Sequence, residues 1–135
     1  MNKTQLKAFF DAEFAANKLQ FEESGDSTLI VRRSITKQDL RPGGTVSGPV
    51  MMSLADSAMY AAVLQQTGLS MVVTSSLTIN FFRRPLADAD LLAKVELLKT
   101  GRSLIIGDVR LYSEGQSKML AQANVTYSVP PSISK

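Results

Sequence analysis

The sequence predicts an α+β fold in which an antiparallel sheet packs around one long central helix. A helix-length segment at 49–66 carries a single charge, and four later segments alternate apolar and polar residues between short turns. The chain has 135 residues, of which 44% are hydrophobic and 20% charged, as is typical of one globular domain. Strands that follow one another closely after a single helix favour antiparallel pairing around that helix.

The N-terminal part is predicted to be a helix followed by a turn and a strand. The helix covers residues 3–19, capped by Asn2 or Thr4, because apolar side chains recur near helical spacing at Leu6, Phe9, Phe10, Phe14 and Leu19. Residues 23–27, ESGDS, are predicted to turn, and residues 28–35 are predicted to form a strand.

The central helix follows a loop at 41–49, RPGGTVSGP, which has three Gly and two Pro. Pro49 suits the first helical position with Gly48 as its cap, so the helix should run from about Pro49 to Gln66 and end at Gly68. Residues 42–82 contain no charge other than Asp56. A helix without a charged face is predicted to be buried.

The rest of the chain is predicted to be four strands and a short tail. Each strand segment has period-two alternation or a β-branched run, bounded by Gly, Pro or Asp: residues 72–82, 91–97, 104–112 and 119–127. We assign one domain over 1–135, in which residues 1–20 are an N-terminal helical segment and residues 130–135 a tail.

Composition excludes several kinds of chemistry. There is no Cys and no His, which excludes disulfides, thiolate catalysis and the usual zinc sites, so we expect no metal. Acid–base work must then fall on Asp, Glu, Lys or Tyr. Charges interrupt any signal-like segment near the N-terminus, and no apolar run is long enough to span a membrane, so a cytoplasmic protein without a membrane partner is expected.

The net charge of +3 is mild, and the basic residues occur as small pairs at 32–33 and 83–84, with Lys99 and Arg102 nearby in sequence. Such pairs are either solvated strand edges or contacts to a phosphate-bearing ligand. A nucleic-acid partner is not expected, because no basic stripe alternates with aromatic residues.

Asp56 raises the main functional question, because an unpaired buried carboxylate costs several kcal/mol. One interpretation gives it a structural partner, such as Ser53, Tyr60 or an Arg from a strand. The other places it in a cleft, where dry surroundings would make it a better base or nucleophile.

The start of the helix offers a second candidate group, the Gly48 amide, which either caps the helix or polarises a carbonyl. Gly48 and Asp56 are eight residues apart, roughly 12 Å along a helix, so they cannot act on one carbon from the same chain. If both act, the site combines Gly48 of one subunit with Asp56 of another, most simply in a two-fold dimer.

The segment PGGTVSGPVMMSLADSAMYAAV resembles the hotdog-fold acyl-CoA thioesterases, in particular the phenylacetate-pathway type. The segments LTINFFRRP, LLKTGRSL and AQANVTYSV are similar to later strands of that family, so the resemblance covers about residues 28–129. It implies a hotdog fold, an antiparallel sheet wrapped around the helix, and a homodimer or a dimer of dimers.

The resemblance also implies roles for particular residues. It makes Asp56 the group that attacks the thioester or activates water, and Gly48 the amide that polarises its carbonyl. It places the coenzyme A phosphates near the Arg-Pro segment and the Gly-Arg turn, which suggests the CoA-binding residues Arg83, Arg84, Arg102 and Ser103. Further candidates for substrate binding are Arg41, Ser47, Tyr60 and Asn80.

The chain departs from the family pattern at several of these positions. Ser47 replaces the family His, Pro49 the second Gly, and Arg41 an Asn or Gln. Arg41 could instead pair with Asp56. Tyr60 stands one helical turn after the carboxylate, where a small or hydroxylic residue is usual.

These observations predict hydrolysis of a fatty or aromatic acyl-CoA thioester, with no cofactor beyond the coenzyme A of the substrate. Met51, Met52 and Met59 either suit an apolar acyl chain or pack the core. A hotdog protein that binds acyl-CoA without turnover is the alternative. A hydratase or dehydratase is disfavoured, because such relatives generally use a His.

Overall fold

The computed structural model describes residues 1–14, 16–23 and 28–131. Its elements are α1 (Lys3–Glu13), β1 (Leu19–Glu23), β2 (Thr28–Arg33), the 3-10 turn η1 (Lys37–Asp39), β3 (Leu40–Arg41), β4 (Thr45–Val46), α2 (Gly48–Thr67), β5 (Val73–Phe81), β6 (Leu91–Thr100), β7 (Leu104–Ser113) and β8 (Ala121–Ser128). None of the helices in this described part is long and apolar enough to cross a membrane.

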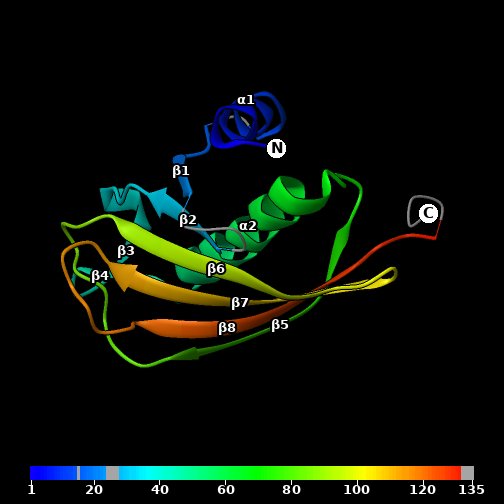
Figure 1. Cartoon of the computed structure of the whole chain (residues 1–135). Coiled ribbons are helices and arrows are strands. Elements are labelled where there is room, and N and C mark those ends of the chain that lie inside the picture. Colours follow the sequence, from blue (N-terminus) through cyan, green and yellow to red (C-terminus); the bar gives the residue numbers. More distant parts are fainter. Residues whose placement is uncertain (15, 24–27, 132–135) are drawn as a thin grey trace.

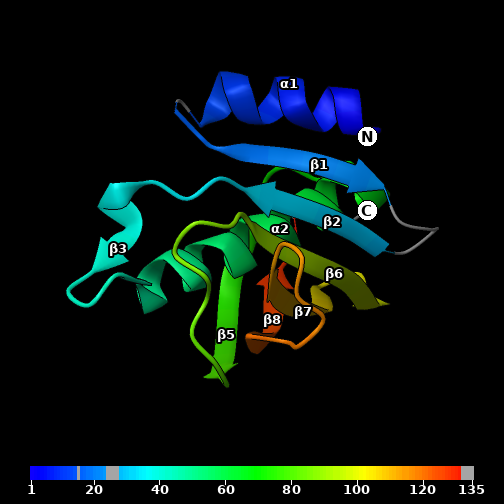
Figure 2. The same cartoon turned by 90° about the vertical axis from the view of Figure 1, so that its left-hand side faces the viewer.

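Six strands form one antiparallel sheet in the order β1-β2-β6-β7-β8-β5. The sheet curves around α2, and α1 lies beyond the β1 edge (Figures 1 and 2). This arrangement confirms the predicted α+β fold with an antiparallel sheet around one long helix. Although β5 directly follows α2, it joins the sheet beside β8, the last strand.

The boundaries of α2 follow from its terminal residues. The Ser47 hydroxyl accepts a hydrogen bond from the Val50 N–H, so Ser47 rather than Gly48 is the cap. The helix ends at Gly68, whose φ of 71° is in the left-handed region that glycine adopts without strain. The prediction of a helix over 49–66 is therefore confirmed to within two residues, and its cap is corrected.

The expectation that α2 is buried all round is wrong. Most of the helix packs on the sheet, and Met59 lies against Gly107 of β7, which has no Cβ to hold it away. However, Met52 and Ser53 are exposed, and Asp56 is half-buried. The sheet covers only part of the helix, and the uncovered face lacks charges other than Asp56. Composition alone therefore could not distinguish that face from a buried one.

The N-terminal helix is shorter than predicted, and residues 19–20 belong to a strand. Helix α1 ends at Glu13, and the Asn17 side chain then donates to the main-chain oxygens of Phe10 and Phe14. Asn17 also accepts from the Leu19 N–H, 3.1 Å away. These bonds add to the hydrogen bonding at the end of α1, where the Phe10 oxygen also accepts from the Phe14 N–H, and the chain turns back to pair β1 with β2. Of the predicted turn at 23–27, residues 24–27 lie outside the described residues.

The loop before α2 contains a small hairpin and a buried ion pair. Strands β3 and β4 pair around Gly43 and Gly44, whose φ values are 97° and 76°. The Asp39 carboxylate binds both terminal nitrogens of Arg33 at 2.9 Å, and this guanidinium holds the pKa of Asp39 well below its usual range. The main-chain oxygen of Asp39 accepts from the Ser47 N–H, which fixes the start of α2.

The two edges of the sheet differ. Helix α1 packs beside β1, whereas the free edge of β5 carries large apolar side chains: Val73 is 58% exposed and Phe81 49%. Along β5, Leu77 and Ile79 are half-buried while Ser76, Thr78 and Asn80 are exposed, as the predicted alternation requires. An open, apolar strand edge is a surface on which another strand can pair.

The pairing of β5 with β8 is irregular at one point. Thr74 faces Tyr127 and Ser76 faces Thr126, which leaves Ser75 without a partner of its own. The Ser75 hydroxyl instead donates to the Thr126 main-chain oxygen. This β-bulge lies at the β5 end nearest to Asp56.

Candidate active site

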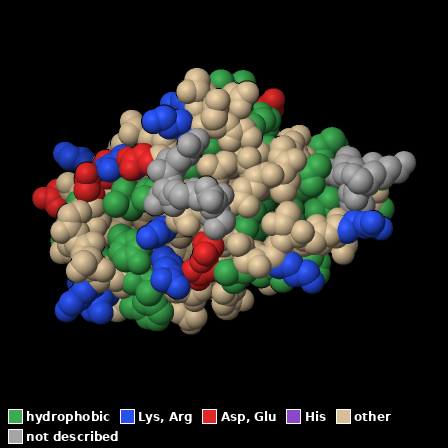
Figure 3. Space-filling model, viewed as in Figure 1, with side chains coloured by type: hydrophobic (Ala, Val, Ile, Leu, Met, Phe, Trp, Pro, Cys, Tyr) green, Lys and Arg blue, Asp and Glu red, His purple; other side chains and the backbone are tan. Residues whose placement is uncertain are grey.

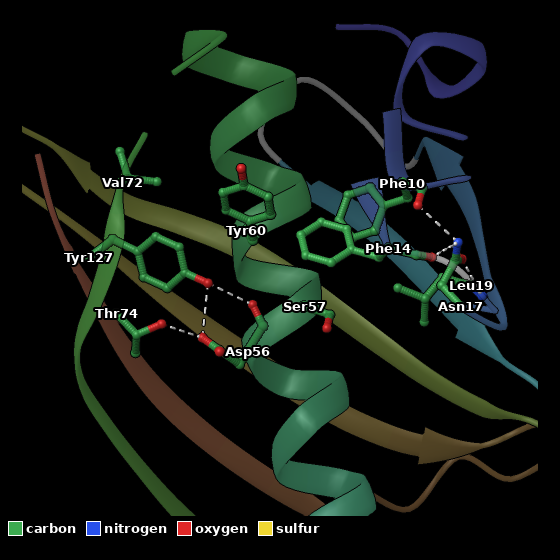
Figure 4. Close-up of a pocket in the computed structure, with 10 residues that line it drawn as sticks. All are labelled: Phe10, Phe14, Asn17, Leu19, Asp56, Ser57, Tyr60, Val72, Thr74 and Tyr127. Carbon is green, nitrogen blue, oxygen red and sulfur yellow. Dashed lines mark hydrogen bonds between the residues drawn. The ribbon is translucent and has the colours of Figure 1, made fainter. Parts of the chain in front are cut away.

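Asp56 lies on the partly uncovered face of α2, where two hydroxyl groups from the sheet bind it (Figure 4). The Thr74 hydroxyl donates to Oδ1 over 2.7 Å. The Tyr127 hydroxyl lies 2.9 Å from Oδ1 and 2.9 Å from the Asp56 main-chain oxygen. Within the described part of the chain, no group donates to Oδ2. The structure therefore fixes the carboxylate through one oxygen and leaves the other available.

Tyr127 remains a hydrogen-bond donor over the accessible pH range. Burial raises the pKa of Tyr127 well above its usual range, and the adjacent Asp56 carboxylate raises it further. Its hydroxyl therefore keeps its proton beside the carboxylate. Neither Tyr127 nor Thr74 was predicted as a site residue. The sequence signal for Tyr127 was only its inward position on the last strand, with a polar tip that needs a partner.

A cavity of about 370 Å³ opens beside Asp56. One side is polar, with Asp56, Ser57 and Thr74, and the other is largely aromatic. Tyr60 stands between the two, its ring centroid 6.2 Å from that of Tyr127 and 6.0 Å from that of Phe14 (Figure 4). The full lining is Phe10, Phe14, Asn17, Leu19, Asp56, Ser57, Tyr60, Val72, Thr74 and Tyr127.

A second cavity, of about 540 Å³, lies at the start of α2. Three arginines line it, Arg41, Arg83 and Arg84, together with Gly48 and Phe81. The Gly48 N–H is the first of the helix and has no intrahelical acceptor, and the positive end of the helix dipole points the same way. The cavity thus offers positive charge and an amide donor to an anionic or carbonyl-bearing ligand.

The remaining predicted residues lie at different places. Ser47 caps α2, and Asn80 is exposed on β5 and lines neither cavity. Tyr60 lines the Asp56 cavity and donates to the Ser70 main-chain oxygen. Arg41 lines the second cavity and is not paired with Asp56. Among the described residues, the side chains that bind Asp56 are Thr74 and Tyr127 rather than Ser53, Tyr60 or an arginine.

The methionines divide between core and surface. Met51 and Met59 are buried, and Met51 also borders the second cavity, whereas Met52 is exposed. None of the three lines the cavity at Asp56.

The two predicted CoA-binding segments lie at opposite ends of the sheet. Arg102 and Ser103 come directly before Leu104. Leu104 and Val73 both pair with Ser128, so Arg102 and Ser103 lie toward the Val73 end of β5. Arg83 and Arg84 follow Phe81, at the other end of β5. Eight strand residues span roughly 27 Å, so one chain does not bring these segments together.

The other basic pair is already engaged in ion pairs. Arg32 binds Asp90 at 3.2 Å and Glu114 at 2.8 Å, and Arg33 binds Asp39. Figure 3 shows Lys, Arg, Asp and Glu in small mixed groups rather than as one continuous basic surface on that face. Among the residues that the structure describes, no three His, Cys, Asp or Glu side chains gather closely enough to hold a metal ion.

Comparisons with known proteins agree with the fold. The family described as the Thioesterase superfamily matches residues 43–120. A solved structure of a candidate thioesterase from Silicibacter sp. TM1040 is 37% identical, with a TM-score of 0.89 over 97% of this chain and 93% of that one. No curated protein matches the chain.

Two more distant structures share the fold. The Escherichia coli PaaI protein from the phenylacetic acid degradation operon is 24% identical, with a TM-score of 0.78 over 94% of this chain and 95% of that one. A hypothetical thioesterase from Streptococcus pneumoniae TIGR4, solved with coenzyme A, is 23% identical, with a TM-score of 0.74 over 82% of this chain and 87% of that one.

The helix wrapped by a single antiparallel sheet is the hotdog fold, which confirms the fold that the resemblance implied. The chain belongs to the thioesterase superfamily, and it is a thioester hydrolase.

Proposed function

We propose that the protein hydrolyses acyl-CoA thioesters, with Asp56 as the catalytic base or nucleophile and the Gly48 amide of a second copy polarising the thioester carbonyl. The observation that carries this proposal is the state of Asp56. Its carboxylate is oriented through Oδ1 by two hydroxyls, no described residue donates to its Oδ2, and a largely apolar cavity opens beside it. Such a carboxylate can reach a carbonyl carbon or a water molecule next to an apolar acyl group.

The free edge of β5 supports a two-fold dimer. If β5 pairs antiparallel with β5 of a second copy, the Phe81 end of one strand lies against the Val73 end of the other. Gly48 lies beside Phe81, because a Cβ on Gly48 would be 3.6 Å from the Phe81 ring. Asp56 accepts a hydrogen bond from Thr74, the residue after Val73. This pairing brings Gly48 of one copy toward Asp56 of the other, as the separation along α2 requires.

The same pairing accounts for the divided CoA-binding segments. Arg83 and Arg84 of one copy would come alongside Arg102 and Ser103 of the other, so that three arginines share one ligand. Arginine suits phosphate because its planar fork makes paired, charge-assisted hydrogen bonds. The Streptococcus pneumoniae relative solved with coenzyme A supports a CoA ester as substrate.

Asp56 can act by either of two routes. As a nucleophile it forms a mixed anhydride with the acyl group, the CoA thiolate leaves and takes up a proton, and water then hydrolyses the anhydride. As a base it takes a proton from a water molecule that attacks the thioester directly. A single turnover in ¹⁸O-labelled water detects the anhydride route when water attacks the Asp56 carbonyl carbon, because only that step places label in the Asp56 carboxylate.

Complementation between two inactive variants tests the shared site. Asp56→Asn removes the carboxylate, and Gly48→Pro removes the amide hydrogen at the first helical position, where proline is tolerated. Each variant alone should be inactive. Co-expressed in equal amounts, they should recover about a quarter of wild-type activity, because half of the dimers are mixed and each mixed dimer has one intact site of two.

Gly48→Ala is the matched control, because it keeps the N–H and its Cβ meets only an ordinary contact with Phe81. It should retain clearly more activity than Gly48→Pro, because only the Pro variant lacks the donor. No recovery in the mixed dimers would place both groups outside a shared site and would contradict the proposal.

Membership of the thioesterase superfamily disfavours the alternative that the sequence left open, a protein that binds acyl-CoA without turnover, although Ser47 replaces the family His. In the structure Ser47 serves as the cap of α2. Under this alternative, wild-type protein binds acyl-CoA but releases no free thiol, and Asp56→Asn changes stability rather than rate.

A further inference from the structure

Part of the cavity at Asp56 is formed by residues outside the matched family segment. The superfamily match begins at residue 43, yet Phe10, Phe14, Asn17 and Leu19 line this cavity. They come from α1, the turn after it and the start of β1. The wall facing Asp56 across Tyr60 therefore comes from a part of the chain that precedes the matched family segment (Figure 4).

We propose that α1 sets the upper size limit of the acyl group, with Phe14 as the specificity-determining residue and Phe10 as its support. This inference rests on the proposed function in one respect: it takes the cavity at Asp56 as the acyl site. The cavity would accept substrates with a compact acyl group. The rings of Phe10 and Phe14 would exclude long unbranched fatty acyl groups.

The volume of the cavity sets the scale of the ligand, and the aromatic rings of its wall set the direction in which a longer chain is blocked. A closed apolar cavity of about 150 Å³ binds benzene. The cavity at Asp56, at about 370 Å³, therefore has room for about two groups of that size. A longer tail directed away from Asp56 would meet Tyr60 and then the rings on α1.

The two phenylalanines differ in how firmly they are held. Phe10 is 2% exposed and packs against Phe21, with ring centroids 5.0 Å apart. Phe14 is 45% exposed and stands at the C-terminal end of α1, 5.2 Å from Phe10 and at 90° to the Tyr60 ring. Removing Phe10 would open the core, whereas removing Phe14 would mainly lengthen the cavity along the Phe10 ring.

The main chain at Phe14 is fixed independently of its side chain. The Phe14 N–H donates to the Phe10 oxygen at 2.8 Å, and the Phe14 oxygen accepts from the Asn17 side chain at 3.0 Å. Phe14→Ala should therefore keep the path of the chain and remove only the ring. Phe9→Ala is the matched control, because Phe9 is on the same helix and does not line the cavity.

The test measures affinity with uncleavable thioethers, S-hexyl-CoA and S-dodecyl-CoA, by titration calorimetry below the concentration at which they form micelles. Wild type and Phe9→Ala should bind the hexyl compound at least as well as the dodecyl compound. Phe14→Ala should shift the affinity ratio toward the dodecyl compound by about tenfold or more, since added methylenes can then be buried. Phe14→Leu should give an intermediate shift, which provides a second reading if the Ala variant unfolds.

The outcomes separate this inference from the proposed function. An unchanged ratio in both Phe14 variants overturns the role of α1, whatever the turnover. Wild type that binds neither thioether also overturns it, because the cavity is then no acyl site. A shifted ratio in a protein that hydrolyses no acyl-CoA supports the inference and contradicts the proposed function. In an active protein, kcat/KM for dodecanoyl-CoA relative to hexanoyl-CoA should rise in Phe14→Ala in step with the affinity ratio.

Discussion

The two cavities along α2 differ in the chemical character of the side chains that line them. The cavity at Asp56 has a single carboxylate among aromatic rings, whereas the cavity at Gly48 has three arginines and the positive end of the helix. Under the proposed function each has what the other lacks for handling a CoA thioester: one cavity has a carboxylate and an apolar wall, and the other has arginines and an amide donor. The helix holds them too far apart to work together in one chain, so the difference favours an assembly in which two copies complete each other.

Removing the Asp56 carboxylate should have the largest effect on activity. Asp56→Asn keeps the shape of the side chain but can neither accept a proton nor form an anhydride. We expect kcat to fall by about 10² or more, the scale of general acid–base catalysis, with KM little changed. Steady-state kinetics measure this. A folded Asp56→Asn protein with nearly normal turnover would assign the chemistry to another group.

The next largest effect is expected from separating the copies. Ser76→Glu with Thr78→Glu places two exposed carboxylates on the free edge of β5, where like charges would face each other across the proposed two-fold axis. Sedimentation should show a loss of dimer, and activity at micromolar protein should fall about tenfold or more with the dimer fraction. A fully active monomer would mean that one chain contains a complete site.

Loss of the Tyr127 hydroxyl tests the positioning of Asp56. Tyr127→Phe keeps the ring and removes a hydrogen bond to a charged group, which is worth about 1.5 kcal/mol or more, or about tenfold. We expect kcat to fall by about that factor with KM unchanged, and Thr74→Val to act in the same direction. If Tyr127 were only structural, the melting temperature would fall while the folded fraction kept its kcat.

Substitutions of the proposed CoA-binding arginines should affect binding rather than chemistry. Arg83→Ala, Arg84→Ala and Arg102→Ala should each raise KM several-fold, lower kcat less, and weaken the dependence of KM on salt. Arg110→Ala is the control, because Arg110 is exposed and pairs with Asp108 away from both cavities. Unchanged KM in all three variants would move the nucleotide site elsewhere.

The smallest effect on activity is expected from Asp39, whose main-chain oxygen accepts a hydrogen bond from the Ser47 N–H at the start of α2, next to Gly48. Its pKa is lowered by Arg33, so the pair contributes stability above the ordinary Asp range. That stability should be lost as the pH falls through the folded-state pKa. Asp39→Asn should therefore melt at lower temperature near neutral pH and show a flatter stability profile under acid, as thermal denaturation at several pH values will measure.

The fold was largely predictable, because its signals are local. The uncharged segment at 49–66, the glycine after it and the alternation in later strands fixed α2 and four strands to within a few residues. Strand β1 was missed because apolar residues recur near helical spacing from Leu6 through Phe10 and Phe14, and Leu19, five residues further on, was included in the same helix. Only Asn17 and the pairing with β2 end the helix earlier, and that pairing is a tertiary contact.

The candidate site was predictable in part. A single carboxylate in a long uncharged segment singled out Asp56, and helix geometry separated it from Gly48. Its partner Tyr127 is 71 residues away in sequence, so no local pattern connects the two. The wall from α1 was also missed, because Phe10 and Phe14 first read as core positions of an amphipathic helix.

The β-bulge at Ser75 determines the side of the sheet on which Thr74 lies. Leu77 pairs with Val125 and Thr74 with Tyr127, and both partners point inward, although three positions separate Thr74 from Leu77. In a regular strand an odd separation would put Thr74 on the outside. Without Ser75 the ladder would be regular, and Thr74 would still face Tyr127, two positions from Leu77 and on the inner side. The bulge therefore lets this strand hold one extra residue between Thr74 and Leu77 without reversing which side chains face the helix.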